Sequence, residues 1–271
     1  VIVQELQLKK GDMLMFKNKI ALLVCAGLAS VPMVASAAWT GKGEAGAALS
    51  NTSSGASSTT FAGKFDLASE VDKWKHAFGA STVYTSSKAE ASAANPNPDT
   101  QTAANRWELH EQTDYKLVDH AFLFGGIRYE NDKIGSYRYQ AALAAGLGYK
   151  FIENDSTKLT AELGVGYKHF KPQSPTGASS DGDAISTGLV DLRQVLSPNT
   201  VLLDKLSFES GSSNTLFQND LAVQVKMTDV LALSVGHQIR YNTKPLRSSY
   251  SGREYAHTDR LLTANLVYEF K

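Results

Sequence analysis

The sequence is poor in the features on which several common functional classes depend. It holds one cysteine, Cys25, and equal numbers of basic and acidic residues, 27 of each, so its formal net charge is +0. A chain without a dominant positive charge gives no broad electrostatic case for binding nucleic acid. From Trp39 onward no apolar run approaches the ~18 residues of a membrane-spanning helix, which excludes a polytopic helical membrane protein.

The first segment that carries a clear signal is the N-terminus, which is typical of an exported protein. Lys17 belongs to a short basic stretch, and an apolar core covers residues 20–34. The core is followed by Ala35-Ser36-Ala37, small residues that suit signal-peptide cleavage before Ala38. We expect two parts: an N-terminal extension and signal peptide over residues 1–37, and the mature protein over residues 38–271.

The alternative for this segment is a single membrane anchor. The apolar core is about 15 residues long and contains Pro32, whereas a helix that spans a bilayer needs about 20 residues. Export is therefore the preferred interpretation. Cleavage would remove Cys25 and leave a mature chain that forms no disulfide and offers no catalytic thiol. Met13 and Met15 can both serve as the start, and the sequence does not choose between them.

Period-two alternation runs through the rest of the chain. In residues 136–152 large apolar side chains occupy every second position, and the positions between them are polar or small. The same division recurs in residues 158–170 and 230–243. Alternation of this kind indicates strands with one apolar face. Since no apolar helix is present, insertion into a membrane requires a closed barrel, in which every backbone N–H and C=O is paired.

A soluble β-sandwich would alternate too, and the aromatic residues separate the two interpretations. Trp74 and Tyr84, or Tyr139 and Tyr149, bracket outward faces at about the length of a tilted membrane-spanning strand. The pattern therefore predicts an all-β fold, an antiparallel transmembrane β-barrel of about 12 strands after a cleaved signal peptide. The expected strands are residues 39–50, 58–69, 74–85, 105–117, 120–130, 136–152, 158–170, 184–196, 201–210, 215–227, 230–243 and 258–270.

The last expected strand carries a second signal. Leu262, Ala264, Leu266, Tyr268 and Phe270 share one face, and such an alternating end with a closing aromatic resembles the assembly signal of outer-membrane barrels. We assign that signal to Tyr268 and Phe270. Lys271 follows the aromatic residue at which such proteins usually stop, which departs from the pattern without affecting the fold.

Several short segments, taken in order, resemble the YdiY-like, salt-induced outer-membrane protein family. They are residues 39–46, 146–151, 209–215, 227–233 and 265–270, and the resemblance covers essentially the whole mature chain. Each motif is short and strand-like, so their order carries the resemblance. The family implies an outer-membrane barrel of undefined biochemical role, and the salt-induced character comes from the family label alone.

Charged side chains of both signs are expected to face the barrel interior. Neighbouring strands would bring them close enough to pair, forming a lattice that fills the lumen; the alternative is a narrow pathway for ions or small solutes. Twelve strands lie between the size that side chains fill and the size that leaves a wide channel, so both hypotheses stay open. The candidate lumen-facing residues are Arg106, Glu108, His110, Asp114, Arg128, Arg138, Glu162, Asp191, Arg193 and Arg240.

We expect no enzyme and no cofactor. The six histidines form no closely spaced pair of metal ligands on one strand face. The remaining enzymatic alternative is a membrane phospholipase with an outward Ser, His and Asn, for which His237 and Asn219 lie on neighbouring expected strands. The outward neighbours of His237 are Val235 and Ile239, so that strand supplies no serine for the imidazole to activate.

The sequence thus predicts a bacterial outer-membrane barrel with a structural or stress-related envelope role, and a narrow pore as the alternative. Its expected partners are outer-membrane lipid and, during biogenesis, the barrel-assembly machinery and periplasmic chaperones. Nucleic acid is not an expected partner. Neither a solute nor an oligomeric state follows from the sequence.

Overall fold

The computed structural model describes residues 39–51, 56–90, 95, 98–173, 179–245 and 256–270. The expected signal peptide, with its cleavage site at Ala35, Ala37 and Ala38, lies outside the described residues, as does Lys271. Among the described residues, no helix is long and apolar enough to cross a membrane.

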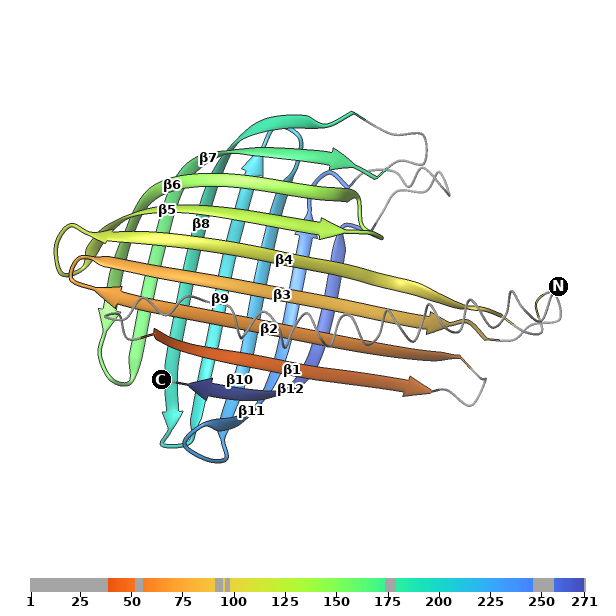
Figure 1. Ribbon diagram of the computed structural model, residues 1–271, viewed down its shortest axis with the longest axis horizontal. Coiled ribbons are helices and arrows are strands. Elements are labelled where there is room, and N and C mark those ends of the chain that lie inside the picture. Colours follow the sequence, from red (N-terminus) through yellow and green to blue (C-terminus); the bar gives the residue numbers. More distant parts are fainter. Residues whose placement is uncertain are drawn as a thin grey trace. The chain divides into compact units, whose positions relative to one another are not determined.

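The described chain forms twelve antiparallel strands in one closed barrel (Figure 1). Each strand pairs with its neighbours in the sequence, and β1 closes the barrel against β12. The predicted fold, an all-β antiparallel barrel of about 12 strands, is confirmed. The strands are β1 (Trp39–Asn51), β2 (Ser57–Val71), β3 (Trp74–Lys88), β4 (Thr100–Lys116), β5 (Ala121–Asp132), β6 (Tyr137–Glu153), β7 (Thr157–Pro172), β8 (Asp181–Ser197), β9 (Thr200–Gly211), β10 (Thr215–Lys226), β11 (Leu231–Asn242) and β12 (Thr258–Phe270).

Strands β3 and β4 are longer than the sequence suggested. The segment 86–104 reads as a polar loop, but the two strands stay paired as far as Lys88 and Thr100, with a register shift between Thr85 and Ser86. Serine and threonine dominate this extension, and backbone pairing needs no apolar face. Hydrophobic alternation therefore marks the part of a hairpin that has an apolar face and misses its polar continuation.

Large apolar side chains cover the outside of the barrel. Leu163 and Val165 on β7 keep 67% and 71% of their surface exposed, while Lys168 on the opposite face of that strand keeps 1%. Water would penalise an outer surface of this kind, whereas lipid would not. The period-two alternation thus reports a barrel with an apolar exterior and a polar interior.

Aromatic side chains gather on the outer face at two levels of the barrel. Trp74 and Tyr115 pack together at the end with short turns, with ring centroids 4.8 Å apart. Trp107 and Tyr129 do so near the other end, with centroids 5.2 Å apart, and Tyr139 stacks on Tyr129. Two separated aromatic levels around an apolar band are typical of barrels that cross a bilayer.

The two ends of the barrel differ in their connections. One end has turns of two to four residues, which begin at Asp72, Leu117, Asn154, Pro198 and Met227. One of the two two-residue turns contains Asp72, whose φ of 55° lies in the left-handed region that aspartate tolerates better than most residues. The connections at the other end include the longer ones, such as residues 89–99 and 243–257. We call the two ends the turn end and the loop end.

The closing seam between β1 and β12 is short. Among the described residues it holds six residue pairs, from Gly41 opposite Phe270 to Gly46 opposite Asn265. The β1–β2 ladder, in contrast, runs the full length of β1 from Trp39 to Asn51. Gly41 has a specific role in this seam, because a Cβ at that position would lie 2.5 Å from the ring of Phe270.

Candidate functional site

The interior of the barrel contains a network of charged and amide side chains that joins opposite walls. Arg240 on β11 donates through Nη2 to Oε2 of Glu130 on β5, at 2.8 Å. Strands β5 and β11 are six places apart in a twelve-strand barrel, so this contact crosses the lumen. The two residues keep only 6% and 4% of their surface exposed. A buried pair of opposite charges lets each ion compensate the lost hydration of the other.

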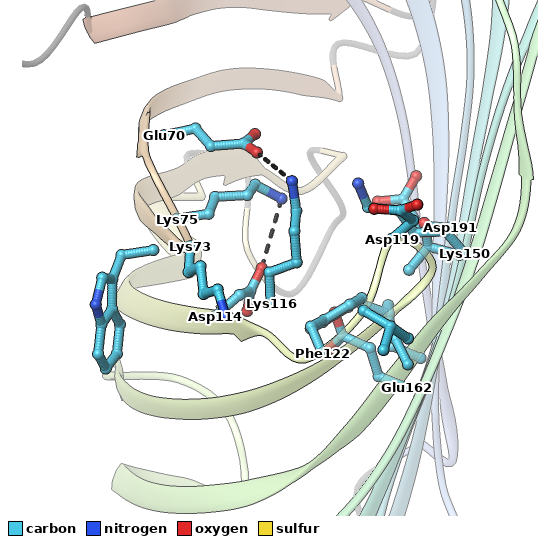
Figure 2. A pocket seen from close by; sticks show the side chains of 15 residues that line it. Glu70, Lys73, Lys75, Asp114, Lys116, Asp119, Phe122, Lys150, Glu162 and Asp191 are labelled. Carbon is cyan, nitrogen blue, oxygen red and sulfur yellow. Dashed lines mark hydrogen bonds and ion pairs between the residues drawn. The ribbon is translucent and has the colours of Figure 1, made fainter.

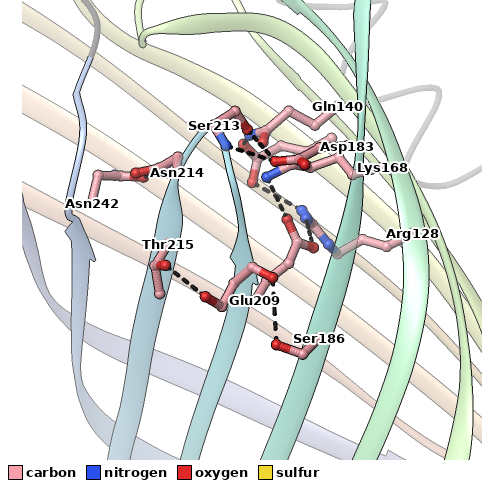
Figure 3. Close-up of polar contacts among 12 residues, drawn as sticks. Arg128, Gln140, Lys168, Asp183, Ser186, Glu209, Ser213, Asn214, Thr215 and Asn242 are labelled. Atoms are coloured by element: carbon pink, nitrogen blue, oxygen red, sulfur yellow. Dashed lines mark hydrogen bonds and ion pairs between the residues drawn. The ribbon is translucent and has the colours of Figure 1, made fainter.

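Glu209 on β9 is the second centre of the network (Figure 3). Its Oε2 accepts a hydrogen bond from Nη2 of Arg128 on β5 at 2.7 Å, and its Oε1 lies 3.0 Å from Nζ of Lys168 on β7. Arg128 also contacts Glu108 at 3.4 Å and Glu130 at 3.7 Å through Nη1. One arginine therefore links three carboxylates, which connects the Glu209 centre to the Arg240–Glu130 pair.

Amide side chains extend the network toward β10 and β4. Arg106 on β4 donates through Nη2 to Oε1 of Gln238 on β11 at 3.0 Å. The Nε2 of Gln238 in turn donates to Oδ1 of Asp220 on β10 at 2.6 Å, and Gln218 donates to Oδ2 of the same carboxylate at 2.7 Å. This arm is a further connection across the lumen, from β4 to β11.

Inward-facing apolar side chains flank the network along the barrel. Phe122 and Phe124 on β5 are buried near the turn end. The Phe122 ring lies against Gly148, and the Phe124 ring lies 2.8 Å from where a Cβ of Gly164 would be. Toward the loop end, Tyr137 and Phe170 pack edge to face with ring centroids 5.2 Å apart. These apolar contacts fill space on both sides of the charged layer.

A small charged pocket of about 130 Å³ lies at the turn end (Figure 2). It contains three of the predicted lumen residues, Asp114, Glu162 and Asp191. Lys75 lies 3.6 Å from Asp114, and Gln112 donates to Glu162 at 3.0 Å. These acids are therefore separate from the central network, although they face the same interior.

The other predicted residues are placed as follows. Arg106, Glu108, Arg128 and Arg240 are members of the central network, and His110 joins its edge with Nδ1 3.6 Å from Glu108. Arg193 lies on β8 opposite Leu203 and, among the described residues, forms no ion pair within 4 Å. Arg138 is exposed and lies in a bulge of the β6–β7 ladder, where Tyr137 and Tyr139 are paired and Arg138 is skipped.

Of the two central acids, Glu130 is predicted to face inward by its strand parity, whereas Glu209 was not predicted as a lumen residue. Glu209 lies near the end of the expected strand 201–210 and also in the segment 209–215 that carries part of the family resemblance. Alternation supplied the missing signal, since Leu206 and Phe208 lie on the outer side and place Glu209 inward. Glu130 and Lys168 have the same inward parity as Arg128 and Gly166 on their strands. The pairing of a given acid with a given base, however, depends on the cross-section of the barrel and does not follow from parity.

The C-terminal residues lie at the seam. Tyr268 is on the outer face with about half of its surface exposed, and Phe270 stacks on Phe65 of β2 with ring centroids 6.1 Å apart. The aromatic pair of the expected assembly signal thus projects from the closing strand, next to β1.

The outward residues considered for a hydrolase are arranged differently from a catalytic set. The side-chain Nδ2 of Asn219 donates a hydrogen bond to Oδ1 of Asp204 at 2.6 Å. In a hydrolase of this kind that amide would instead donate to the oxyanion. Ser234, three residues before His237, is buried with the inward parity of Ala232 and Gly236. In the described part of the chain, no group of three or more His, Cys, Asp or Glu side chains is arranged to hold a metal ion.

Comparison with known proteins gives one family and one curated relative. A family model described as "Protein of unknown function, DUF481" matches residues 44–270. "Uncharacterized protein YdiY" of Escherichia coli (strain K12) is 23% identical over 176 residues, which cover 65% of this chain and 66% of that protein. The matched region thus spans just under two thirds of the relative.

The chain is also similar to several solved structures. The translocator domain of the autotransporter NalP from Neisseria meningitidis has a TM-score of 0.48 and 11% identity, and 96% of each chain is covered. The NanC porin has a TM-score of 0.48 and 11% identity, with 86% of this chain and 100% of that chain covered. The KdgM porin has a TM-score of 0.41 and 10% identity, with 86% and 99% covered.

Proposed function

The chain belongs to the DUF481 family of proteins of unknown function, and from that premise we propose that it is an outer-membrane β-barrel with a closed interior and a structural role in the bacterial envelope. The apolar exterior between two aromatic levels supports the location, since a surface of this kind is stable in lipid. Lipid is therefore its proposed partner in the mature state. The assembly machinery and chaperones remain proposed partners during biogenesis.

One observation carries the closed interior: Arg240 and Glu130 meet at 2.8 Å across the lumen from opposite walls, and both are buried. A hydrated channel would keep its charged side chains solvated and separated by the width of the pore. Here the charges pair directly, with Phe122 and Phe170 buried nearer the two ends. The arrangement supports a lumen that side chains fill.

A second candidate, a narrow pathway for ions, is favoured by the inner face of β1 and β2. Lys64 keeps 45% of its side-chain surface exposed and lies 3.5 Å from Asp66, and Lys42 contacts Glu44 at 3.1 Å. These pairs are more hydrated than the Arg240 pair. If water followed this wall from end to end, ions would pass beside the network and not through it.

Conductance separates the two candidates. Purified full-length protein in planar bilayers should be silent over a range of salt concentrations and voltages if the network closes the lumen. The variant Arg240→Ala should then produce currents, or raise the frequency of brief openings, while Arg138→Ala should stay silent because Arg138 is exposed and outside the network. Step-like currents from the wild-type protein that change selectivity with Lys64→Glu would overturn the closed interior and establish the pathway.

The envelope role is tested apart from conductance. A strain that lacks the protein should lose outer-membrane integrity under osmotic stress, measured as entry of a large dye, and a silent barrel should restore it. Release of fatty acid from phospholipid by the purified protein would contradict a structural role without catalysis. Restoration only by variants that conduct would favour the pathway.

A further inference from the structure

The outer wall contains a groove that the closed interior does not explain. It crosses β2 to β7 and has a volume of about 780 Å³, within the range of about 300–1,000 Å³ of small-molecule sites. Two adjacent rows of outward side chains form it, one through Ala80, Leu109, Tyr129 and Ala141, the other through Phe78, Ile127 and Leu143. The small side chains of Ala80 and Ala141 lie between large ones and make the floor. We call this feature the wall groove.

Basic residues collect where the wall groove reaches the loop end. His169 on β7 lines the groove, and its Nε2 lies 3.4 Å from the hydroxyl of Tyr139. Lys171 is paired with Tyr139 across the β6–β7 ladder, so it shares the outward face. Arg138 precedes Tyr139 in the bulge, is exposed, and forms no ion pair among the described residues. We call Arg138, His169 and Lys171 the basic rim.

The bulge accounts for the position of Arg138. Strict alternation would send Tyr137 outward with Tyr139 and Arg138 into the lumen. The extra residue breaks that parity, so Tyr137 is buried against Phe170 inside the barrel and Arg138 is left exposed beside the outward Tyr139. Arg138 is thereby an exposed charge at the level of the loop-end aromatic residues.

We propose that the wall groove and the basic rim bind an acidic lipid, with an acyl chain in the groove and a phosphate at the rim. An apolar trough that ends at basic side chains matches an amphiphile with a long apolar part and an anionic head. Arginine and lysine are well suited to phosphate oxygens. The rim lies beside Tyr129 and Tyr139, at the level where a bilayer changes from hydrocarbon to headgroups.

Glu111 is the one carboxylate in the wall groove, and its position is compatible with an anionic lipid. It accepts a hydrogen bond from Thr113 at 2.6 Å, and Thr113 contacts Nδ1 of His76 at 2.8 Å. Two strand spacings separate β4 from β6, so Glu111 is about 10 Å or more from the rim. The phosphate site and the carboxylate are therefore distinct parts of the surface.

Tryptophan quenching provides the test, because Trp107 packs on Tyr129 beside the wall groove. The full chain, with Trp39 and Trp74 replaced by Phe so that Trp107 is its single tryptophan, is reconstituted in phosphatidylcholine vesicles with brominated phosphatidic acid or, in parallel, brominated phosphatidylcholine. Wild-type protein should bind brominated phosphatidic acid in preference to brominated phosphatidylcholine by about fivefold or more, because each basic residue near a membrane surface raises the affinity for an anionic lipid by about fivefold. Added salt should reduce this preference. Equal quenching by the two lipids would overturn the proposal.

Variants locate the preference. Arg138→Gln with Lys171→Gln should abolish it, whereas Arg260→Gln, an exposed cation at the loop end of β12, should leave it intact. Ala141→Leu fills the groove floor from the lipid side and should weaken quenching of Trp107 by both brominated lipids. Loss of the preference in Arg260→Gln alone, or its survival in the rim variant, would refute the assigned site. Lys171, Ala141 and Arg260 share the outward parity of their strands, and Arg138 lies outside the central network, so a conducting wild-type barrel would not affect the result.

Discussion

At the scale of the residue, the contribution of a charged side chain to stability depends on whether it is buried and on which group it pairs with. Arg240 and Arg138 are both arginines near the loop ends of their strands, yet one is buried against Glu130 and the other is exposed. Removing a buried partner leaves an uncompensated charge in a medium that cannot hydrate it, whereas removing an exposed charge changes little.

This contrast gives the first prediction. Arg240→Leu should lower the free energy of unfolding by about 3 kcal/mol, near the lower end of the range for a broken buried ion pair. The loss is not larger because Glu130 would still contact Arg128 at 3.7 Å and Gln140 at 3.2 Å. Urea unfolding of the protein in lipid vesicles would measure it. The matched control is Arg138→Leu, for which less than about 0.5 kcal/mol is expected. An equal loss in both variants would mean that the network does not stabilise the barrel.

A second prediction concerns Gly148, where a side chain has no room. Gly148→Val should cost about 1–3 kcal/mol, because its Cβ would collide with the ring of Phe122. The double variant with Phe122→Ala should recover part of that loss, since the ring is gone. Gly125→Val is the control, because nothing lies within 4 Å of a Cβ there. A loss in Gly148→Val that Phe122→Ala leaves unchanged would assign the cost to the backbone.

Much of the residue-scale site was predictable from strand parity, and its pairings were not. Parity placed Arg106, Glu108, Arg128 and Arg240 inside, where they meet. Parity did not predict that Arg240 pairs with Glu130, because contacts between opposite walls depend on the cross-section of the barrel. Parity fails at Arg138, because a bulge inserts one residue and no hydrophobic pattern marks it.

At the scale of the element, each strand has an apolar outer face and an interior face. The sequence located all twelve strands because a half-apolar strand produces a strong period-two signal. The ends of β3, β4 and β8 were missed, since they continue as polar ladders without an apolar face. The sequence therefore predicts which residues of a strand face outward more reliably than it predicts where the strand ends.

The outward face of β7 gives a third prediction. Leu163→Arg should destabilise the barrel by about 2–4 kcal/mol, because a charge near the middle of the bilayer must be dehydrated or must thin the lipid around it. Val118→Arg is the control, since Val118 is as exposed as Leu163 but lies in a turn at the barrel end. Folding titrations in vesicles of one composition would measure both. Equal tolerance would place Leu163 away from the membrane midplane.

At the scale of the whole molecule, the proposed export of the chain would precede its insertion as a barrel. The fourth prediction is that protein purified from the membrane fraction begins at Ala38, because the small residues at Ala35 and Ala37 suit the cleavage site. N-terminal sequencing of the purified protein would measure this. Ala37→Leu should block processing and leave the longer chain in the inner membrane. A wild-type protein that keeps residues 20–34 would contradict both the cleavage and the proposed location.

The six-pair seam between β1 and β12 has a consequence for how the barrel is completed. Its strands come from the two extremes of the described chain, so joining them is the contact with the largest loop-closure entropy and should form after the neighbouring hairpins. Until it forms, the edges of both strands present unpaired backbone groups that hydrocarbon cannot satisfy. The rate of membrane insertion should accordingly be governed by this one junction. Because the seam has fewer residue pairs than any other ladder among the described residues, it is also where a completed barrel would separate first under force.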